Sequence, residues 1–132
     1  MNNDFAPFEL AVKLKEKGYP QHQCDYAYIT EDDEYEEHYV IGDREYIPFI
    51  PDYLPTIASP TISQVLKWLR VEKKIHLIVE ISDSGWYYTL YPNVRWENGE
   101  LKSDKYIMSF KHKASCEQAA LAGIEYVLDN LI

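Results

Sequence analysis

Cysteine, glycine and long apolar runs are scarce in this sequence, and each scarcity excludes a class of protein. Only Cys24 and Cys116 are present, which predicts free thiols rather than a disulfide framework. The five glycines are isolated from one another, so the sequence contains no glycine-rich loop that would cradle a phosphate. No apolar run has the length that a membrane span requires. We therefore expect no membrane partner.

The amino terminus and the basic residues add two further absences. The chain begins Met-Asn-Asn-Asp, without the basic and apolar segments of a signal peptide, which predicts a cytoplasmic protein. Residues 1–60 hold 4 Lys and Arg against 13 Asp and Glu, whereas residues 61–132 hold 9 of each. The net charge of −9 therefore arises before residue 61. Because such a field repels phosphate backbones, the composition disfavours a nucleic-acid partner.

Metal and catalytic motifs are also missing. The four histidines, His22, His38, His76 and His112, are scattered and form no HExxH or paired Cys/His spacing. The nearest approach to a ligand set is His22, Cys24 and His38, and ordinary loop and strand residues explain it better. Neither cysteine lies in a local signature of a catalytic nucleophile. The sequence predicts no metal, no cofactor and no catalytic residue, and hence a protein that is not an enzyme.

The acidic segment Glu31–Glu37 is the densest run of charge. An EF-hand loop would need oxygen ligands at alternate positions around a central glycine, and consecutive carboxylates do not match it. Like charges at this density oppose burial. We therefore expect a solvated loop or the tip of a hairpin here.

Three segments have the sequence pattern of amphipathic helices. The first runs from Pro7 to Gly18, which suit the first turn and the C′ position of a helix. The other two begin at capping boxes, Thr61–Gln64 and Ser115–Gln118. Apolar residues recur on one face of each helix at helical spacing: Leu10, Ala11 and Leu14; Ile62, Val65, Leu66 and Leu69; Ala120, Ile124, Val127, Leu128 and Leu131.

Strand signals fill most of the remaining chain. Alternation or β-rich composition predicts strands at residues 26–30, 39–41, 75–81, 86–91 and 105–110. Asn98-Gly99 is a strong hairpin signal. Residues 46–60 contain four prolines and many apolar residues, which predicts an extended connector packed on the surface rather than a helix.

Together these elements predict an α+β fold in a single domain, residues 1–132. The order is α-β-β, the proline-rich connector, then α-β-β-β-α. Two helices covering one face of a mainly antiparallel sheet would bury the apolar stripes. The connector is the one candidate boundary, and the segment before it is short for a core of its own.

Three segments resemble a group of small proteins from Bacteroides genomes and their phages or prophages. They are Phe8–Tyr19 (FELAVKLKEKGY), Pro60–Arg70 (PTISQVLKWLR) and Cys116–Leu128 (CEQAALAGIEYVL). The chain departs from the group at Cys116, where a tyrosine is usual, so this cysteine does not look essential. The resemblance implies a mobile-element or gut-bacterial origin. It implies no activity, cofactor or site residue.

Aromatic residues are the most informative feature that remains, and tyrosine stands out with 12 copies. In a strand over residues 86–91, Trp86 and Tyr88 point to one face and Tyr87 and Tyr91 to the other. One set must serve the core. The other, with Trp96, is a candidate platform for binding, although cross-strand packing beneath the connector is the plainer interpretation.

Three hypotheses about function follow. The first is a small non-enzymatic interaction or accessory protein of a mobile element, a monomer or homodimer that binds a protein partner. The second is a nucleic-acid-binding module, because the α-β-β-β-α order is similar to that of double-stranded-RNA-binding domains and Lys111 and Lys113 precede the last helix. The third is an acidic mimic of nucleic acid that uses Glu31–Glu37.

Overall fold

The computed structural model describes residues 4–21, 26–31, 34–38 and 56–132. The chain divides into two compact units, Met1–Thr61 and Ile62–Ile132. Each unit buries apolar side chains of its own, such as Leu14 in the first and Leu90 in the second. The single domain that the sequence predicts for residues 1–132 stays a prediction.

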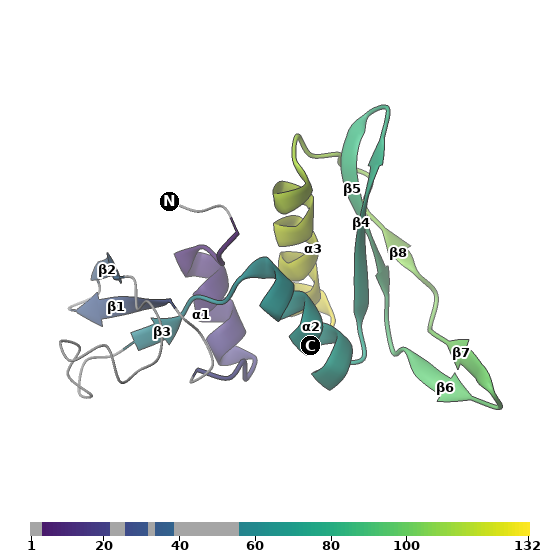
Figure 1. Ribbon diagram of the computed structural model, residues 1–132, viewed down its shortest axis with the longest axis horizontal. Coiled ribbons are helices and arrows are strands. Elements are labelled where there is room, and N and C mark those ends of the chain that lie inside the picture. Colours follow the sequence, from purple (N-terminus) through teal and green to yellow (C-terminus); the bar gives the residue numbers. More distant parts are fainter. Residues whose placement is uncertain (1–3, 22–25, 32–33, 39–55) are drawn as a thin grey trace. The chain divides into compact units, whose positions relative to one another are not determined.

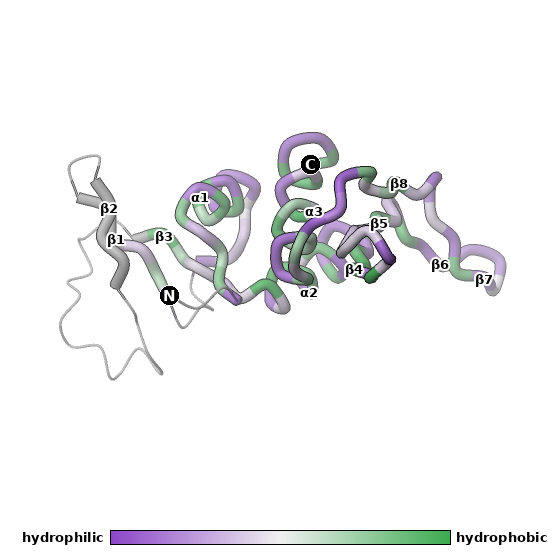
Figure 2. Tube along the Cα trace, turned by 90° about the horizontal axis from the view of Figure 1, so that it is seen from above, coloured by the Kyte–Doolittle hydropathy of each residue, from purple (hydrophilic) through white to green (hydrophobic). Residues whose placement is uncertain are grey.

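In the first unit, helix α1 (Phe8–Glu16) buries the predicted face (Figure 1). Leu10, Ala11 and Leu14 are all buried, as their spacing indicates. The tube of each helix alternates between hydrophobic and hydrophilic residues (Figure 2). The helical pattern in the sequence therefore reports the face that the fold covers.

Helix α1 ends where the sequence predicts. Gly18 has φ +92°, a conformation that favours glycine. The Tyr19 N–H donates to the Leu14 carbonyl at 2.9 Å, and the Gly18 N–H donates to the Lys15 carbonyl at 3.1 Å. This pair of bonds is a Schellman motif, which satisfies two of the last carbonyls of the helix.

The strands of this unit form an antiparallel sheet in the order β2-β1-β3. The strands are β1 (Ala27–Glu31), β2 (Glu34–His38) and β3 (Thr56–Ala58). Strand β1 matches the strand predicted at residues 26–30. Strand β3 is extended, as predicted for the end of the connector, and the rest of residues 46–60 lies outside the described ranges. The strand predicted at residues 39–41 lies outside them as well.

The acidic segment departs from the loop that its charge predicts. Glu31 of β1 pairs with Glu34, the first residue of β2, so the segment contributes residues to two paired strands. Within the described part of the sheet, β2 is an edge strand. Charged side chains are common on edge strands because they discourage pairing with other chains. Dense charge in the sequence is therefore compatible with an extended, paired backbone.

The chain before α1 is tied to this sheet through Ala6. The Ala6 carbonyl accepts hydrogen bonds from the Tyr28 hydroxyl at 2.9 Å and from the Ser59 hydroxyl at 2.8 Å. The Ala6 N–H donates to the Pro60 carbonyl at 2.8 Å. Because these groups are buried, the bonds satisfy polar atoms that would otherwise be costly.

The second unit sets helices against one face of an antiparallel sheet, whose strand order is β4-β5-β8. Helix α3 packs on β4 and β5, and α2 packs on α3 and β4 (Figure 1). The α+β class is confirmed, and the predicted order α-β-β-α-β-β-β-α roughly matches the observed one, which also contains β3 and a further hairpin between β5 and β8. The sheets of the two units are separate rather than one. The main elements here are α2 (Ile62–Glu72), β4 (His76–Ser82), β5 (Gly85–Tyr91), β8 (Ile107–Met108) and α3 (Cys116–Asn130).

Small residues bring α3 close to the sheet. A Cβ atom on Gly123 would lie 2.6 Å from Leu77 Cδ1 and 3.0 Å from Tyr88 Cγ. Such distances are far shorter than normal contacts, so glycine is needed for this approach. The buried residues of α3 are Ala119, Ala120, Gly123, Ile124, Val127 and Leu128.

The first turn of α3 contains the predicted capping box, with one difference. The Ser115 hydroxyl accepts a hydrogen bond from the Gln118 N–H at 3.1 Å. The Gln118 side-chain oxygen accepts from the Ala114 N–H at 3.2 Å, one residue earlier than the usual box. The side chains thus still satisfy two backbone donors at the helix start.

Helix α2 buries Val65, Trp68 and Leu69. The predicted stripe contains Val65 and Leu69, whereas its other members, Ile62 and Leu66, are half-buried. The Lys73 ammonium lies 5.2 Å from the centre of the Trp68 ring. The buried face of α2 therefore includes the large indole of Trp68, which the predicted stripe does not contain.

Between β5 and β8 the chain forms a separate hairpin, β6 (Arg95–Glu97) and β7 (Glu100–Lys102). It extends beyond the end of β5 (Figure 1). The turn residues Asn98 and Gly99 have φ angles of 52° and 77°. Two successive positive φ angles are the mark of a type I′ turn, and the predicted hairpin is confirmed.

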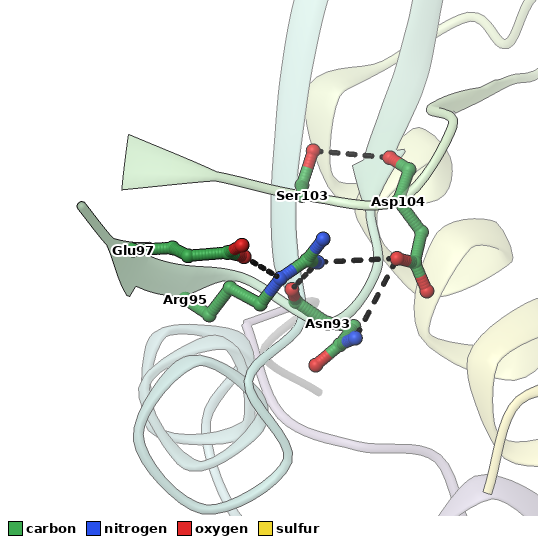
Figure 3. Close-up of polar contacts among 5 residues, drawn as sticks. All are labelled: Asn93, Arg95, Glu97, Ser103 and Asp104. Carbon is green, nitrogen blue, oxygen red and sulfur yellow. Dashed lines mark hydrogen bonds and ion pairs between the residues drawn. The ribbon is translucent and has the colours of Figure 1, made fainter. Parts of the chain in front are cut away.

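Polar side chains tie together the base of this hairpin (Figure 3). Arg95 Nη1 donates to Asp104 Oδ1 and to the Asn93 carbonyl, both at 3.1 Å. Arg95 Nε donates to Glu97 Oε2 at 3.1 Å. The bond with Glu97, followed by that with Asp104, raises the pKa of Arg95, so the guanidinium keeps its charge. The Ser103 hydroxyl donates to the Asp104 carbonyl at 3.0 Å.

Candidate functional site

The strand register separates the two faces of sheet β4-β5-β8. Leu77 lies opposite Leu90, and Val79 opposite Tyr88, so these four side chains share a face. Gly123 of α3 contacts Leu77 and Tyr88. This face is therefore the one that the helices cover.

Alternate residues form the other face, which we call the open face. Both α2 and α3, the described helices of residues 62–132, lie on the opposite side of the sheet (Figure 1). The open face consists of His76, Ile78 and Glu80 from β4, Tyr87, Thr89 and Tyr91 from β5, Tyr106 and Met108 at β8, and His112.

Aromatic rings gather at both ends of the open face. At one end the Tyr91 ring lies 6.1 Å from the Tyr106 ring and 6.4 Å from the His76 ring. At the other, the rings of Tyr87 and His112 meet edge to face at 5.4 Å. Such distances are typical of favourable aromatic pairs. The rings thus hold one another in place before any ligand binds.

A row of three side chains, Ile78, Thr89 and Met108, lies between these two groups of rings. Thr89 is opposite Ile78 on β4 and opposite Met108 on β8. Thr89 is only 4% exposed, whereas Met108 is 43% and Tyr106 is 54% exposed. The larger side chains around Thr89 therefore present most of the accessible surface.

The polar chemistry of the open face is suited to binding. The Tyr87 hydroxyl donates to Glu80 Oε2 at 2.9 Å. This hydrogen bond is the largest cause of a raised pKa at Tyr87, so the phenol keeps its proton at neutral pH. Glu80 and His112 are exposed to water. In this setting the three groups can donate and accept hydrogen bonds.

The structure divides the predicted aromatic site among three surfaces. Tyr87 and Tyr91 lie on the open face, whereas Trp86 and Tyr88 belong to the face that α3 covers. The Tyr88 ring lies 6.5 Å from that of Tyr126. Trp96 is on β6, 73% exposed and opposite Leu101, which is 69% exposed. The five residues therefore do not form one platform.

Sequence reasoning missed the residues that β8 and the following segment bring to the open face. Met108 ends β8, Tyr106 precedes that strand and His112 follows it, and His76 begins β4. The alternation of Tyr106, Met108 and Phe110 was the available signal. Phe110, beyond the end of β8, is 95% exposed.

The other candidate residues do not assemble into a site in the described ranges. His22 and Cys24 lie outside those ranges, and His38 ends β2. Cys116 is a half-buried free thiol at the first residue of α3. Where the chain is described, no group of three potential metal ligands occurs. None of the helices given above has both the length and the apolar character to cross a membrane.

The order α2-β4-β5-β8-α3 corresponds to the predicted α-β-β-β-α order, which is similar to that of double-stranded-RNA-binding domains. The β6-β7 hairpin is inserted between β5 and β8. That likeness concerns element order, which does not by itself determine function. Comparison with protein-family models, with curated proteins and with solved structures finds no match to this chain.

Proposed function

We propose that this chain is a small protein-binding module that holds a protein partner on the open face. The observation that carries the proposal is the set of Tyr87, Tyr91, Tyr106 and Met108 on the side of the sheet away from α2 and α3. Tyrosine and methionine are enriched in protein interfaces. The proposal includes no catalysis and no cofactor, in keeping with the absence of catalytic motifs from the sequence.

The tyrosines suit binding for a physical reason. Each offers a large apolar ring and a hydroxyl, and it loses little conformational freedom when it is fixed. Ring contacts already restrict Tyr87 and Tyr91. A partner would therefore meet a partly ordered surface, which lowers the entropic cost of association.

Charge indicates the chemistry of the partner. Glu80 is the acidic group of the open face, and residues 1–60 give the whole chain its net charge of −9. A negative protein associates faster with a positive surface. The rings can also receive Lys or Arg through cation–π contacts. The partner that fits is a protein surface with apolar side chains flanked by basic ones.

The nucleic-acid hypothesis has the element order of α2 to α3 in its favour. Phosphate binding would need a cluster of positive charge, and in this unit the cations near α3 are few and carboxylates lie among the same elements. Glu117 lies in the first turn of α3, and Asp83 lies in the β4–β5 turn. Lys111 and Lys113 are the cations that precede α3. Because phosphate contacts dominate nucleic-acid affinity, the protein-binding proposal is preferred.

The test uses two matched double variants of the full chain. Tyr91→Ala with Met108→Ala removes an aromatic and an aliphatic side chain from the open face. Trp96→Ala with Leu101→Ala makes the same kind of change on the β6-β7 hairpin. Proteins captured from a Bacteroides lysate by the wild type are identified, purified and titrated against all three chains by calorimetry.

We expect a basic partner that binds the wild type and the hairpin variant equally, and the open-face variant at least about tenfold more weakly, a loss typical of interface truncation. Circular dichroism establishes that both variants are folded. Equal binding by both variants would contradict the proposal. So would binding that disappears after nuclease treatment and returns with purified RNA at low salt.

A further inference from the structure

Strand β4 is an edge of its sheet, and its outer side has no partner among the described residues. It runs for seven residues, and every one of them is paired on the inner side with β5. The outer backbone groups therefore form a regular row. Such a row is a template for another strand.

The hydrogen bonds of β5 identify the residues that form this row. Trp86 exchanges backbone bonds with Lys113, and the Tyr88 carbonyl accepts from Ser109. Both residues thus direct their backbone groups away from β4. Their partners Ile81 and Val79 occupy non-hydrogen-bonded pairs, which alternate along an antiparallel ladder. The N–H and C=O groups of Leu77, Val79 and Ile81 consequently point to the outer edge.

The edge lacks the usual protection against pairing. Natural edge strands carry proline, lysine or a bulge that blocks association. Strand β4 reads HLIVEIS, with an unbroken register and Glu80 as its one carboxylate. Ile81 is 64% exposed at the end of the strand. A long, apolar and regular edge is expected where another strand docks.

The order of side chains makes this edge complementary to itself. If two copies of β4 pair antiparallel about a two-fold axis at Ile78, each His76 faces Glu80 of the second copy. Leu77 then faces Val79 of the second copy, and both have outward backbone groups that can bond. Shifting the axis to Val79 would instead set Glu80 against Ile78. The first register joins polar with polar and apolar with apolar residues.

The local structure also limits the length of the pairing. The Ile75 N–H already donates to the Leu69 carbonyl at 3.0 Å, so a new strand can bond only beyond it. An axis at Ile78 sets residues 76–80 of the two copies against one another, all within β4, whereas an axis at Val79 would overlap the whole strand. The pairing of His76 with Glu80, rather than the length of the overlap, therefore favours the Ile78 register.

From these observations we infer that a second copy of this chain docks along the outer edge of β4, through antiparallel pairing in which His76 faces Glu80. Two three-stranded sheets then become one sheet of six strands. The open faces of the copies join into one surface. The inference concerns the edge of the sheet, and because His76 and Glu80 also belong to the open face, its test measures self-association rather than the binding of a protein partner.

Sedimentation velocity of the full chain from micromolar to millimolar concentration tests the inference. The average mass of the wild type should rise from 15.5 kDa toward twice that value. His76→Glu alone sets two carboxylates against each other, and Glu80→Lys alone sets lysine against histidine, so each should remain monomeric. An equimolar mixture of the two variants should recover dimers. In the mixed dimer, the carboxylate introduced at position 76 faces the ammonium introduced at position 80, and the other contact is the native pair of His76 with Glu80.

Controls separate this outcome from folding defects and from the open face. Circular dichroism must give the wild-type spectrum for both single variants. Tyr106→Ala lies off β4 and should dimerise like the wild type. A wild type that stays monomeric throughout, single variants that still dimerise, or a mixture without recovery would each overturn the inference. Loss of dimers in Tyr106→Ala would also overturn it by assigning self-association to the open face.

Discussion

Gly123 is a position where α3 packs tightly against the sheet, and a single added methyl group tests that packing. Gly123→Ala gains about 1 kcal/mol of helix propensity but places its Cβ within 3.0 Å of the Tyr88 ring. Overpacking of this kind costs about 1–3 kcal/mol. We expect a net loss of about 1 kcal/mol in the free energy of unfolding, measured by urea denaturation.

A matched alanine substitution separates packing from helix propensity. Lys67 is exposed on α2, so Lys67→Ala should change the unfolding free energy by no more than about 0.5 kcal/mol. If Gly123→Ala were as stable as this control or more stable, the close approach of α3 to Leu77 and Tyr88 would be wrong.

Tyr88 makes stability sensitive to alkaline pH. Burial, and then the charge of Tyr126, raises the pKa of Tyr88 above its ordinary 10.0. The folded chain thus holds this proton more tightly than the unfolded chain. The resulting stabilisation is complete below pH 10.0 and is lost as the pH rises through the raised pKa. Tyr88→Phe should therefore lose stability less steeply above pH 10.0, as measured by urea unfolding at a series of pH values. Identical pH profiles for both chains would refute this role.

At the scale of single residues, the sequence predicts which residues share a face of a strand better than it predicts which face the helices cover. Strict alternation separates Trp86 and Tyr88 from Tyr87 and Tyr91 correctly. Both sets are aromatic, however, so composition cannot identify the set beneath α3. The deciding feature is Gly123, whose missing side chain admits Tyr88 and Leu77, and this contact spans distant parts of the sequence.

At the scale of elements, the start of α3 depends on a side-chain cap. Ser115→Ala removes the acceptor of the Gln118 N–H and should lower the unfolding free energy by about 1 kcal/mol. Ser115→Asp keeps an acceptor at the same position and should remain near the wild type. Equal stability of the alanine and aspartate variants, compared by thermal or urea unfolding, would contradict the assigned cap.

Helices were more predictable than strands in this chain for a physical reason. A helix satisfies its backbone locally, so spacing and caps such as Ser115–Gln118 locate it closely. A strand depends on its partners. The segment at residues 105–110 has a strand pattern, but only Ile107–Met108 pairs as β8. Residues 34–37 have a loop-like composition, yet they pair with β1. Pairing of this kind involves distant residues and leaves little local trace.

At the scale of the whole molecule, the tryptophans allow the two units to be followed separately. Trp68, Trp86 and Trp96 all lie in Ile62–Ile132. Leu14 is fully buried in the other unit, and Leu14→Ala should cost that unit about 2–5 kcal/mol. In urea unfolding followed by far-ultraviolet circular dichroism, we expect part of the signal to be lost at a lower urea concentration than in the wild type. The midpoint followed by tryptophan fluorescence should stay unchanged. An equal fall in both would instead favour the single domain that the sequence predicts.

The overall fold class was accessible from sequence, while the arrangement into sheets was not. The order of helices and strands follows from periodicity, turn residues and caps. Whether strands join one sheet or several depends on long-range pairing, such as β3 with β1. The candidate site shows the same limit, because Tyr87 and Tyr91 lie on a predicted strand whereas Tyr106 and His112 reach them through the path of the chain after β7.

The β6-β7 hairpin also offers a practical position for modifying the protein. Strands β6 and β7 pair with each other in a two-stranded sheet. A hydrogen bond from Arg95 to Asp104 links residues at the base of the hairpin. Exposed tips of this kind tolerate added residues better than core strands do. A fluorescent or affinity tag inserted between Asn98 and Gly99 would therefore report on the chain without a fusion at either terminus.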